Sequence, residues 1–207
     1  MCIVAFIDNI TDLFDDYSKR LVRRGITLIT PVEGMSKEDI VHWIVSNNVR
    51  CLMVDYKLKP NFDFVGTDLV AYINSILPDL PCMILTAYPQ ESLNEKLVIK
   101  NMIEDRSVLD SNDFDSFADK LKQAVEVFER RLSRHEEEYR NLLQKNASRQ
   151  LTIEEEERRL ELYKLLKAYN FVDELPTELL RSEVAKKVDS IIDKLNKLLN
   201  NNPAEGE

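Results

Sequence analysis

Four short apolar runs, separated by longer amphipathic stretches, constrain the fold of this chain more than any other feature. The runs are Cys2–Ile7, Ile26–Val32, Cys51–Val54 and Cys82–Leu85. Short runs that are largely apolar and rich in Ile and Val are typical of strands covered on both faces. Such strands belong to parallel sheets with helices on each side, so the pattern favours an α/β fold.

The stretches between these runs carry apolar residues at helical spacing. Helices are predicted over Thr11–Arg24, Ser36–Ser46 and Thr67–Leu77, each with an apolar face. Ser36 followed by Asp39 is a signal for the start of a helix. Because strand and helix alternate about four times, the sequence indicates a parallel sheet with helices on both faces.

The region after the fourth run has a weaker pattern. A helix is predicted over Ser92–Ile103, and a short fifth strand over Ser107–Leu109, where charged residues flank it. Asp113 then caps a helix whose apolar residues continue at helical spacing to Leu142, and no Gly or Pro interrupts Asp113–Asn146. We therefore expect one long helix that begins on the sheet and leaves it.

The last third of the chain is predicted to be helical. Thr152 and Glu155 have the spacing of a capping box before a helix over Glu154–Tyr169. A further helix over Thr177–Asn200 spaces its apolar residues by alternating steps of four and three, at Val184, Val188, Ile191, Leu195 and Leu198. This apolar seam requires a partner helix, and the sequence leaves open whether the partner lies in the same chain or in another.

Composition excludes several classes of protein. The 207 residues include 28 Lys and Arg against 37 Asp and Glu, a formal charge of −9, so nucleic acid and anionic membranes are poor partners. No apolar run approaches the roughly 20 residues that a spanning helix needs. Met1 also leads into the first apolar run without the basic segment of a signal peptide. Cys2, Cys51 and Cys82 lack metal-ligand spacing, and we expect reduced, buried thiols in a cytoplasmic protein.

Polar side chains follow three of the predicted strands. Asp8 and Asn9 follow the first, Asp55 follows the third, and Thr86 follows the fourth. In open parallel sheets, ligands bind beyond the carboxyl ends of the strands, where these residues converge. Two carboxylates and an amide oxygen suit Mg²⁺. A carboxylate beside such a metal can accept a phosphoryl group, and a threonine hydroxyl can hydrogen-bond it.

In these residues the chain resembles the receiver domain of bacterial two-component response regulators. The resemblance covers about Met1 to Phe128, and its most specific parts are GTDLVAYI at 66–73 and PDLPCMILTAY at 78–88. It implies a flavodoxin-like, doubly wound, five-stranded parallel sheet and a histidine kinase as phosphoryl donor. The implied roles are phospho-acceptor for Asp55, switch hydroxyl for Thr86, and Mg²⁺ site for Asp8, Asn9 and Asp55.

The chain departs from the pattern of the family at functional positions. Asn9 replaces one carboxylate of the acidic pair, which weakens the attraction for Mg²⁺. The lysine that the family carries after the fifth strand falls on Asp110 or Ser111, and neither can pair with a phosphoryl group. Lys57 is a candidate substitute. The aromatic switch residue of the family also has no counterpart on the predicted fifth strand.

The sequence thus predicts a receiver-like domain over 1–128, a helical, coiled-coil module over 129–200 and a disordered tail over 201–207. We expect a signalling adaptor that acts through protein contacts, forms a homodimer or grips a partner through its C-terminal helices, and is not an enzyme. Two interpretations stay open. The chain is either an atypical response regulator phosphorylated on Asp55, or a non-phosphorylated pseudo-receiver that serves as a structural or regulatory subunit of a larger complex.

Overall fold

Two compact units make up the chain, Met1–Arg134 and His135–Glu207. The computed structural model describes residues 2–9 and 14–173. The helix predicted over Thr177–Asn200, its apolar seam and the predicted tail lie outside the described residues. Across the described part of the chain, no helix is long and apolar enough to cross a membrane.

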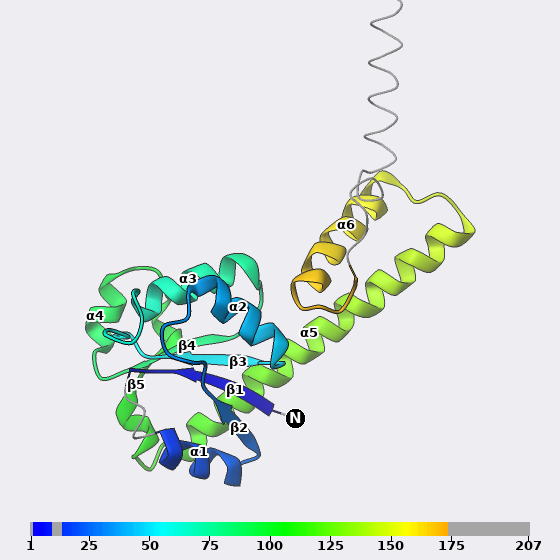
Figure 1. Ribbon diagram of the computed structural model, residues 1–207. Coiled ribbons are helices and arrows are strands. Elements are labelled where there is room, and N and C mark those ends of the chain that lie inside the picture. The colour runs from blue at the N-terminus through cyan, green and yellow to red at the C-terminus, as the bar shows by residue number, and fades with distance from the viewer. Residues whose placement is uncertain (1, 10–13, 174–207) are drawn as a thin grey trace, which may run out of the picture. The chain divides into compact units, whose positions relative to one another are not determined.

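A five-stranded, all-parallel sheet forms the centre of the first unit (Figure 1). The strands are β1 (Cys2–Ile7), β2 (Ile26–Ile29), β3 (Cys51–Val54), β4 (Cys82–Thr86) and β5 (Ile103–Asp105). Their order is β2-β1-β3-β4-β5, which is the doubly wound, flavodoxin-like order. The predicted fold class of this unit is confirmed.

Helices connect the strands and cover both faces of the sheet. They are α1 (Phe14–Arg23), α2 (Lys37–Ser46), α3 (Gly66–Ile76), α4 (Pro89–Asn94) and α5 (Phe114–Ser148), with 3₁₀ turns at Lys100–Met102 and Arg106–Leu109. α1 and the start of α5 pack on one face of the sheet, whereas α2 and α3 lie on the other (Figure 1). The predicted cap of α2 is present, because Ser36 Oγ accepts a hydrogen bond from Asp39 N.

Burial on both faces explains the continuous apolar runs of the sequence. Every residue of β3 and β4 is buried. Alternate residues of a strand point to opposite faces, and Val4, Phe6 and Met53 therefore pack with Tyr17 and Leu21 of α1 in one core cluster. Since the strands are held from both sides, the residues that follow them are fixed at one edge of the sheet.

The fifth strand lies earlier in the chain than the sequence predicted. β5 covers Ile103–Asp105, whereas the predicted segment, Ser107–Leu109, forms part of a 3₁₀ turn. The helix predicted over Ser92–Ile103 is also wrong, since α4 ends at Asn94. β5 is a short edge strand that ends in two acidic residues and is only half-buried, so it lacks the apolar signature of the others. The residue that directly follows it is Arg106.

The described part of the second unit consists of the end of α5 and the helix α6 (Ile153–Ala168). The predicted capping box is confirmed, because Thr152 Oγ1 accepts from Glu155 N and Glu155 Oε2 accepts from Thr152 N. Arg158 donates to both carboxylate oxygens of Glu138 at 2.9 and 2.8 Å, which links α6 to α5. The two helices bury Tyr139, Leu142, Leu162, Tyr163 and Leu166.

Candidate functional site

Asp8, Asp55 and Thr86 lie where three neighbouring strands end. Ile7 and Val54 are partners in the parallel register of β1 and β3, so Asp8 and Asp55 follow adjacent strands at the same level. Asp55 N donates to Ile7 O at 2.8 Å, which fixes the backbone of Asp55 against β1. Asp55 is 4% exposed, and Thr86 is fully buried. The fold thus places the three predicted residues at the carboxyl edge of adjacent strands.

Arg106 adds a cation that the sequence analysis missed. Its Nη2 lies 2.8 Å from Asp8 Oδ2 and 3.1 Å from Asp55 Oδ1. The sequence analysis placed the basic position of the family on Asp110 or Ser111 because it used the wrong bounds for the fifth strand, whereas Arg106 directly follows β5. Asp110, the predicted counterpart, instead forms an ion pair with Arg20 at 3.3 Å.

All three ionic side chains of this site are nearly closed to solvent, with exposed fractions of 13% for Arg106, 6% for Asp8 and 5% for Asp55. Charges in such a place interact more strongly than charges on the surface, because less water screens them. Two buried carboxylates require a cation close by. Arg106 meets this requirement from its place directly after β5, on the far side of β4 from β3.

Asn9 lies next to this group and anchors a loop. Its Nδ2 donates to Lys59 O at 3.0 Å, and its own carbonyl accepts from Asn61 Nδ2 at 3.3 Å. Both partners belong to the loop between β3 and α3, so Asn9 holds that loop beside the site. The predicted role of Asn9 as a metal ligand stays a prediction.

The donor set fits a divalent cation in part. Asp8 and Asp55 direct one oxygen each toward a single position, which is the arrangement that an oxygen-ligated ion requires. A third carboxylate is missing, and within residues 2–9 and 14–173 no group of three or more His, Cys, Asp or Glu side chains could hold a metal. A Mg²⁺ ion would therefore depend on two carboxylates, an amide or carbonyl oxygen and water.

Helix α3 begins directly against the backbone of Asp55. A Cβ atom on Gly66 would lie 2.0 Å from Asp55 O and 2.9 Å from Val54 Cγ1, so only glycine allows this approach. Gly66 N also donates to Tyr56 O at 2.9 Å. The position of Asp55 is therefore set by the start of α3 as well as by β1.

Lys57, the candidate substitute for the lysine of the family, points instead to Tyr88 and to Glu91 of α4. Lys57 Nζ lies 2.9 Å from Glu91 Oε2 and 3.4 Å from the centre of the Tyr88 ring. Tyr88 N in turn donates to Thr86 Oγ1 at 3.2 Å. A short chain of contacts thus joins Thr86 to the residues that follow Asp55.

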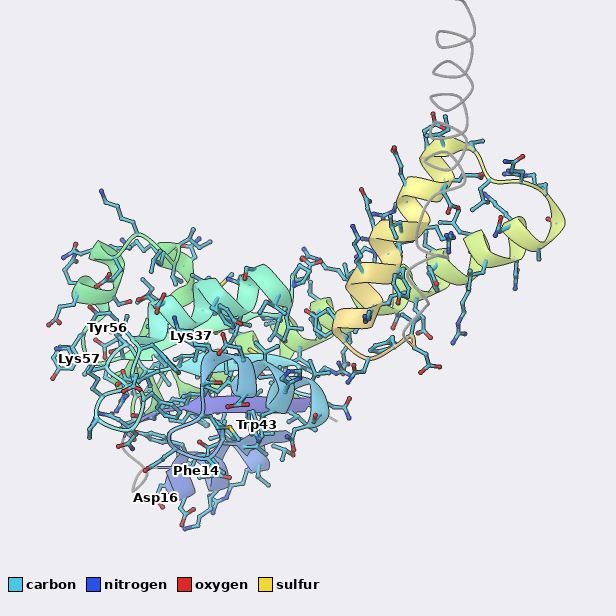
Figure 2. The ribbon with its side chains drawn as sticks, turned by 45° about the horizontal axis from the view of Figure 1, so that its top comes forward. Phe14, Asp16, Lys37, Trp43, Tyr56 and Lys57 are labelled. Atoms are coloured by element: carbon cyan, nitrogen blue, oxygen red, sulfur yellow. The ribbon has the colours of Figure 1, made fainter. Side chains whose placement is uncertain are left out.

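Tyr56 makes a second link to the same region. Its hydroxyl donates to Glu95 Oε1 at 2.8 Å, and this hydrogen bond raises the pKa of Tyr56 above its ordinary value. Figure 2 shows Tyr56 and Lys57 side by side at one end of the unit. Two neighbouring residues after Asp55 therefore hold α4 in place.

No protein-family model matches the chain, and no curated protein matches it. Several solved structures are similar. The response regulator TrrA from Thermotoga maritima, in complex with Mg²⁺ and BeF, is 17% identical, with a TM-score of 0.47 over 60% of this chain and 99% of its own. A receiver domain protein from Clostridium thermocellum is 18% identical, with a TM-score of 0.47 over 61% and 95%.

The response regulator RcsB from Salmonella typhimurium is 13% identical, with a TM-score of 0.47 over 84% of this chain and 94% of its own. For the first unit, the strand order and connections described above establish a receiver-like fold.

Proposed function

We propose that the first unit is a receiver domain that accepts a phosphoryl group on Asp55, and that the whole chain is a signalling adaptor acting through protein contacts. The observation that carries the proposal is the contact between Arg106 and Asp55. It supplies a cation beside Asp55, which the sequence analysis did not find after the fifth strand.

Each residue of the site has a role in this transfer. An oxygen of Asp55 attacks phosphorus, and the P–N bond of a kinase phosphohistidine breaks as the P–O bond forms. Arg106 offsets the added negative charge through charge-assisted hydrogen bonds to the phosphoryl oxygens. Thr86 donates its hydroxyl hydrogen to one of these oxygens. Because Asp55 is almost fully buried, water has little access to the resulting acyl phosphate.

Asp8, Asp55 and Asn9 are the residues that would hold Mg²⁺. A bound ion offsets the charge of the carboxylates and of the incoming phosphoryl group. Because Asn9 brings no charge, we expect weaker binding than at a site with three carboxylates.

The helices beyond the sheet are the proposed route to partners. We propose that the apolar seam predicted over 184–198 pairs with a second copy of the chain, and that a histidine kinase is the phosphoryl donor in the cytoplasm. We assign the protein no enzymatic activity of its own.

Mass spectrometry of the intact chain tests the proposal. We expect a single phosphoryl adduct after incubation with acetyl phosphate and Mg²⁺, and no adduct in Asp55→Asn. Asp63→Asn is the matched control, because Asp63 is exposed in the same loop, and it should be labelled like the wild type. If the wild type is not labelled under conditions that label a known receiver, Asp55 is not a phospho-acceptor.

The second candidate is the non-phosphorylated pseudo-receiver, a structural or regulatory subunit of a larger complex. The double ion pair of Arg106 favours it, because Asp8 and Asp55 already have a counterion. In that case the mass of the chain stays unchanged, whereas Asp55→Asn still weakens the first unit by removing one partner of Arg106.

A further inference from the structure

The two carboxylates of the site converge on one nitrogen atom. Arg106 Nη2 lies 2.8 Å from Asp8 Oδ2 and 3.1 Å from Asp55 Oδ1. A guanidinium group usually pairs with one carboxylate through two nitrogens, whereas here one nitrogen serves two carboxylates. It therefore contacts one oxygen of each carboxylate at the same time.

Electrostatic repulsion keeps Arg106 and a divalent ion from occupying this position together. Without Arg106, two nearly closed carboxylates would carry two negative charges close together, which favours the capture of another cation. With Arg106 in place, a divalent ion between the same oxygens would lie within a few ångströms of the guanidinium charge, and the two cations would repel each other. The arginine and the ion thus compete for the same oxygens.

Two atoms of this trio are incompletely satisfied. Arg106 Nε is buried without a hydrogen bond to any residue that the structure describes, and Asp55 Oδ1 has the ionic contact with Arg106 Nη2 but no hydrogen bond of regular geometry. Buried polar atoms usually have a hydrogen-bond partner. A donor such as Nε suits a phosphoryl oxygen, and an acceptor such as Asp55 Oδ1 suits a cation. The ionic contacts of Arg106 therefore leave this site only partly satisfied.

We propose that Arg106 is the built-in counterion of the resting site and that Mg²⁺ binds only when the guanidinium withdraws from Asp8 and Asp55. The inference deepens the proposed function, since it concerns the same site. In the phosphorylated state, Arg106 turns its donors to the phosphoryl oxygens and leaves the carboxylates to the metal. Arg106 thereby sets the Mg²⁺ concentration that the site requires.

Calorimetric titration of Mg²⁺ into the full chain, with no phosphodonor present, tests the competition. We expect Arg106→Gln to bind Mg²⁺ at least tenfold more tightly than the wild type, and Asp8→Asn in the same background to abolish that gain. Arg50→Gln is the matched control. Arg50 is 17% exposed and pairs with Glu129 at 3.8 Å, but it precedes β3 and so lies at the opposite edge of the sheet. Equal affinities in Arg106→Gln and the wild type overturn the proposal.

A second measurement uses the wild-type chain alone and so does not depend on whether a variant folds. In the wild-type chain, the NMR signal of the Arg106 Nε–Hε group should shift as Mg²⁺ is added. The midpoint of this shift should fall at the same Mg²⁺ concentration as the midpoint of the calorimetric titration. An unchanged signal at high Mg²⁺ concentration overturns the proposal. The two proposals can fail independently. Equal Mg²⁺ affinities in Arg106→Gln and the wild type would overturn the competition but not the phosphorylation of Asp55. If Asp55 is not labelled, the proposed function fails, whereas the competition between Arg106 and Mg²⁺ does not.

Discussion

Gly66 shows at the scale of single residues how closely the backbone surrounds Asp55. Because a Cβ atom at Gly66 would overlap Asp55 O, Gly66→Ala must displace either the end of β3 or the start of α3. We expect the free energy of unfolding to fall by about 3 kcal/mol, the upper part of the usual range for overpacking. Labelling of Asp55 should fall as well. Urea denaturation measures the first effect.

Gly34→Ala is the control for this change. Gly34 has φ +79°, and nothing lies within 4 Å of a Cβ atom built there. The substitution therefore adds backbone strain of about 1–2 kcal/mol without crowding. If both alanine variants lose the same stability and both are labelled normally, close approach at Gly66 does not govern the site.

The cysteines give a second prediction at this scale. Burial raises the pKa of Cys51 to about 12, and it also raises the pKa of Cys82. Since the thiolate is the reactive form, both should be inert in the folded chain at pH 8, and only the partly exposed Cys2 should react. Ellman's reagent should detect one thiol in the native protein and three in denaturant. Two fast-reacting native thiols would contradict the packing of β3 and β4.

At the scale of elements, β1 and β5 show why the sequence predicts some strands and not others. The bounds of β1 follow from the apolar run Cys2–Ile7, because that strand is covered on both faces. β5 has only three residues, and one of them, Glu104, forms an ion pair with Lys120 of α5. Its fold-determining contacts are made by backbone pairing with β4, which leaves little trace in the side-chain pattern.

This difference also decides how much of the site could be predicted. Asp8, Asp55 and Thr86 follow strands with a clear apolar signature and were identified. Arg106 follows β5 and was missed. The sequence analysis placed the fifth strand on the apolar residues Val108 and Leu109, which come after Arg106 in the chain. In the structure Leu109 is buried in a 3₁₀ turn. Apolar character alone does not distinguish such a turn from a short edge strand.

Helix α4 has only six residues, and its links to the β3–α3 loop should govern its stability. Removing the hydrogen bond between Tyr56 and Glu95 in Tyr56→Phe should cost about 1 kcal/mol. Amide hydrogen exchange in α4 should become about fivefold faster. Tyr72→Phe removes a similar bond, to Glu38 at 3.0 Å, and should leave α4 unchanged. Unaltered exchange of α4 in Tyr56→Phe would show that this bond does not hold the helix.

The start of α6 should respond to pH through Glu155. Hydrogen bonds from Arg149 and from Thr152 N lower the pKa of Glu155 from 4.5 to about 2. A carboxylate with a lowered pKa stabilises the fold above its ordinary pKa, and that stabilisation is lost as the pH falls toward 2. Carboxyl NMR should therefore find Glu155 titrating near pH 2, and Arg149→Gln should move the midpoint upward. A midpoint near 4.5 in the wild type would contradict the capping geometry.

At the scale of the whole molecule, α5 belongs to both units. Its first part buries Phe117, Leu121 and Val125 in the core beside the sheet, and its last part buries Tyr139 and Leu142 in the helical unit. Its 35 residues form one helix without a break, as the absence of Gly and Pro predicts. A chain built in this way connects the unit that holds Asp55 covalently to the helices that we propose as the route to partners.

Dimer formation through the predicted seam can be tested in the full chain by sedimentation equilibrium. Leu195 is one of the five positions of the predicted seam, and an aspartate there would place a charge in an apolar interface at a cost of at least about 3 kcal/mol. Leu195→Asp should therefore raise the dissociation constant of the dimer at least a hundredfold, which about 2.7 kcal/mol suffices to produce. Asn196→Asp adds the same charge beside the seam and should leave the dimer intact.

The outcomes separate the alternatives that the sequence left open. A wild-type chain that is monomeric at every concentration would mean that the seam does not pair two copies of the chain. A dimer that survives Leu195→Asp would mean that another surface joins the two copies. If the dimer forms equally in Asp55→Asn and in the phosphorylated wild type, pairing is constitutive. Phosphorylation would then act on the partners that the dimer binds, because it cannot shift an equilibrium whose two states it affects equally.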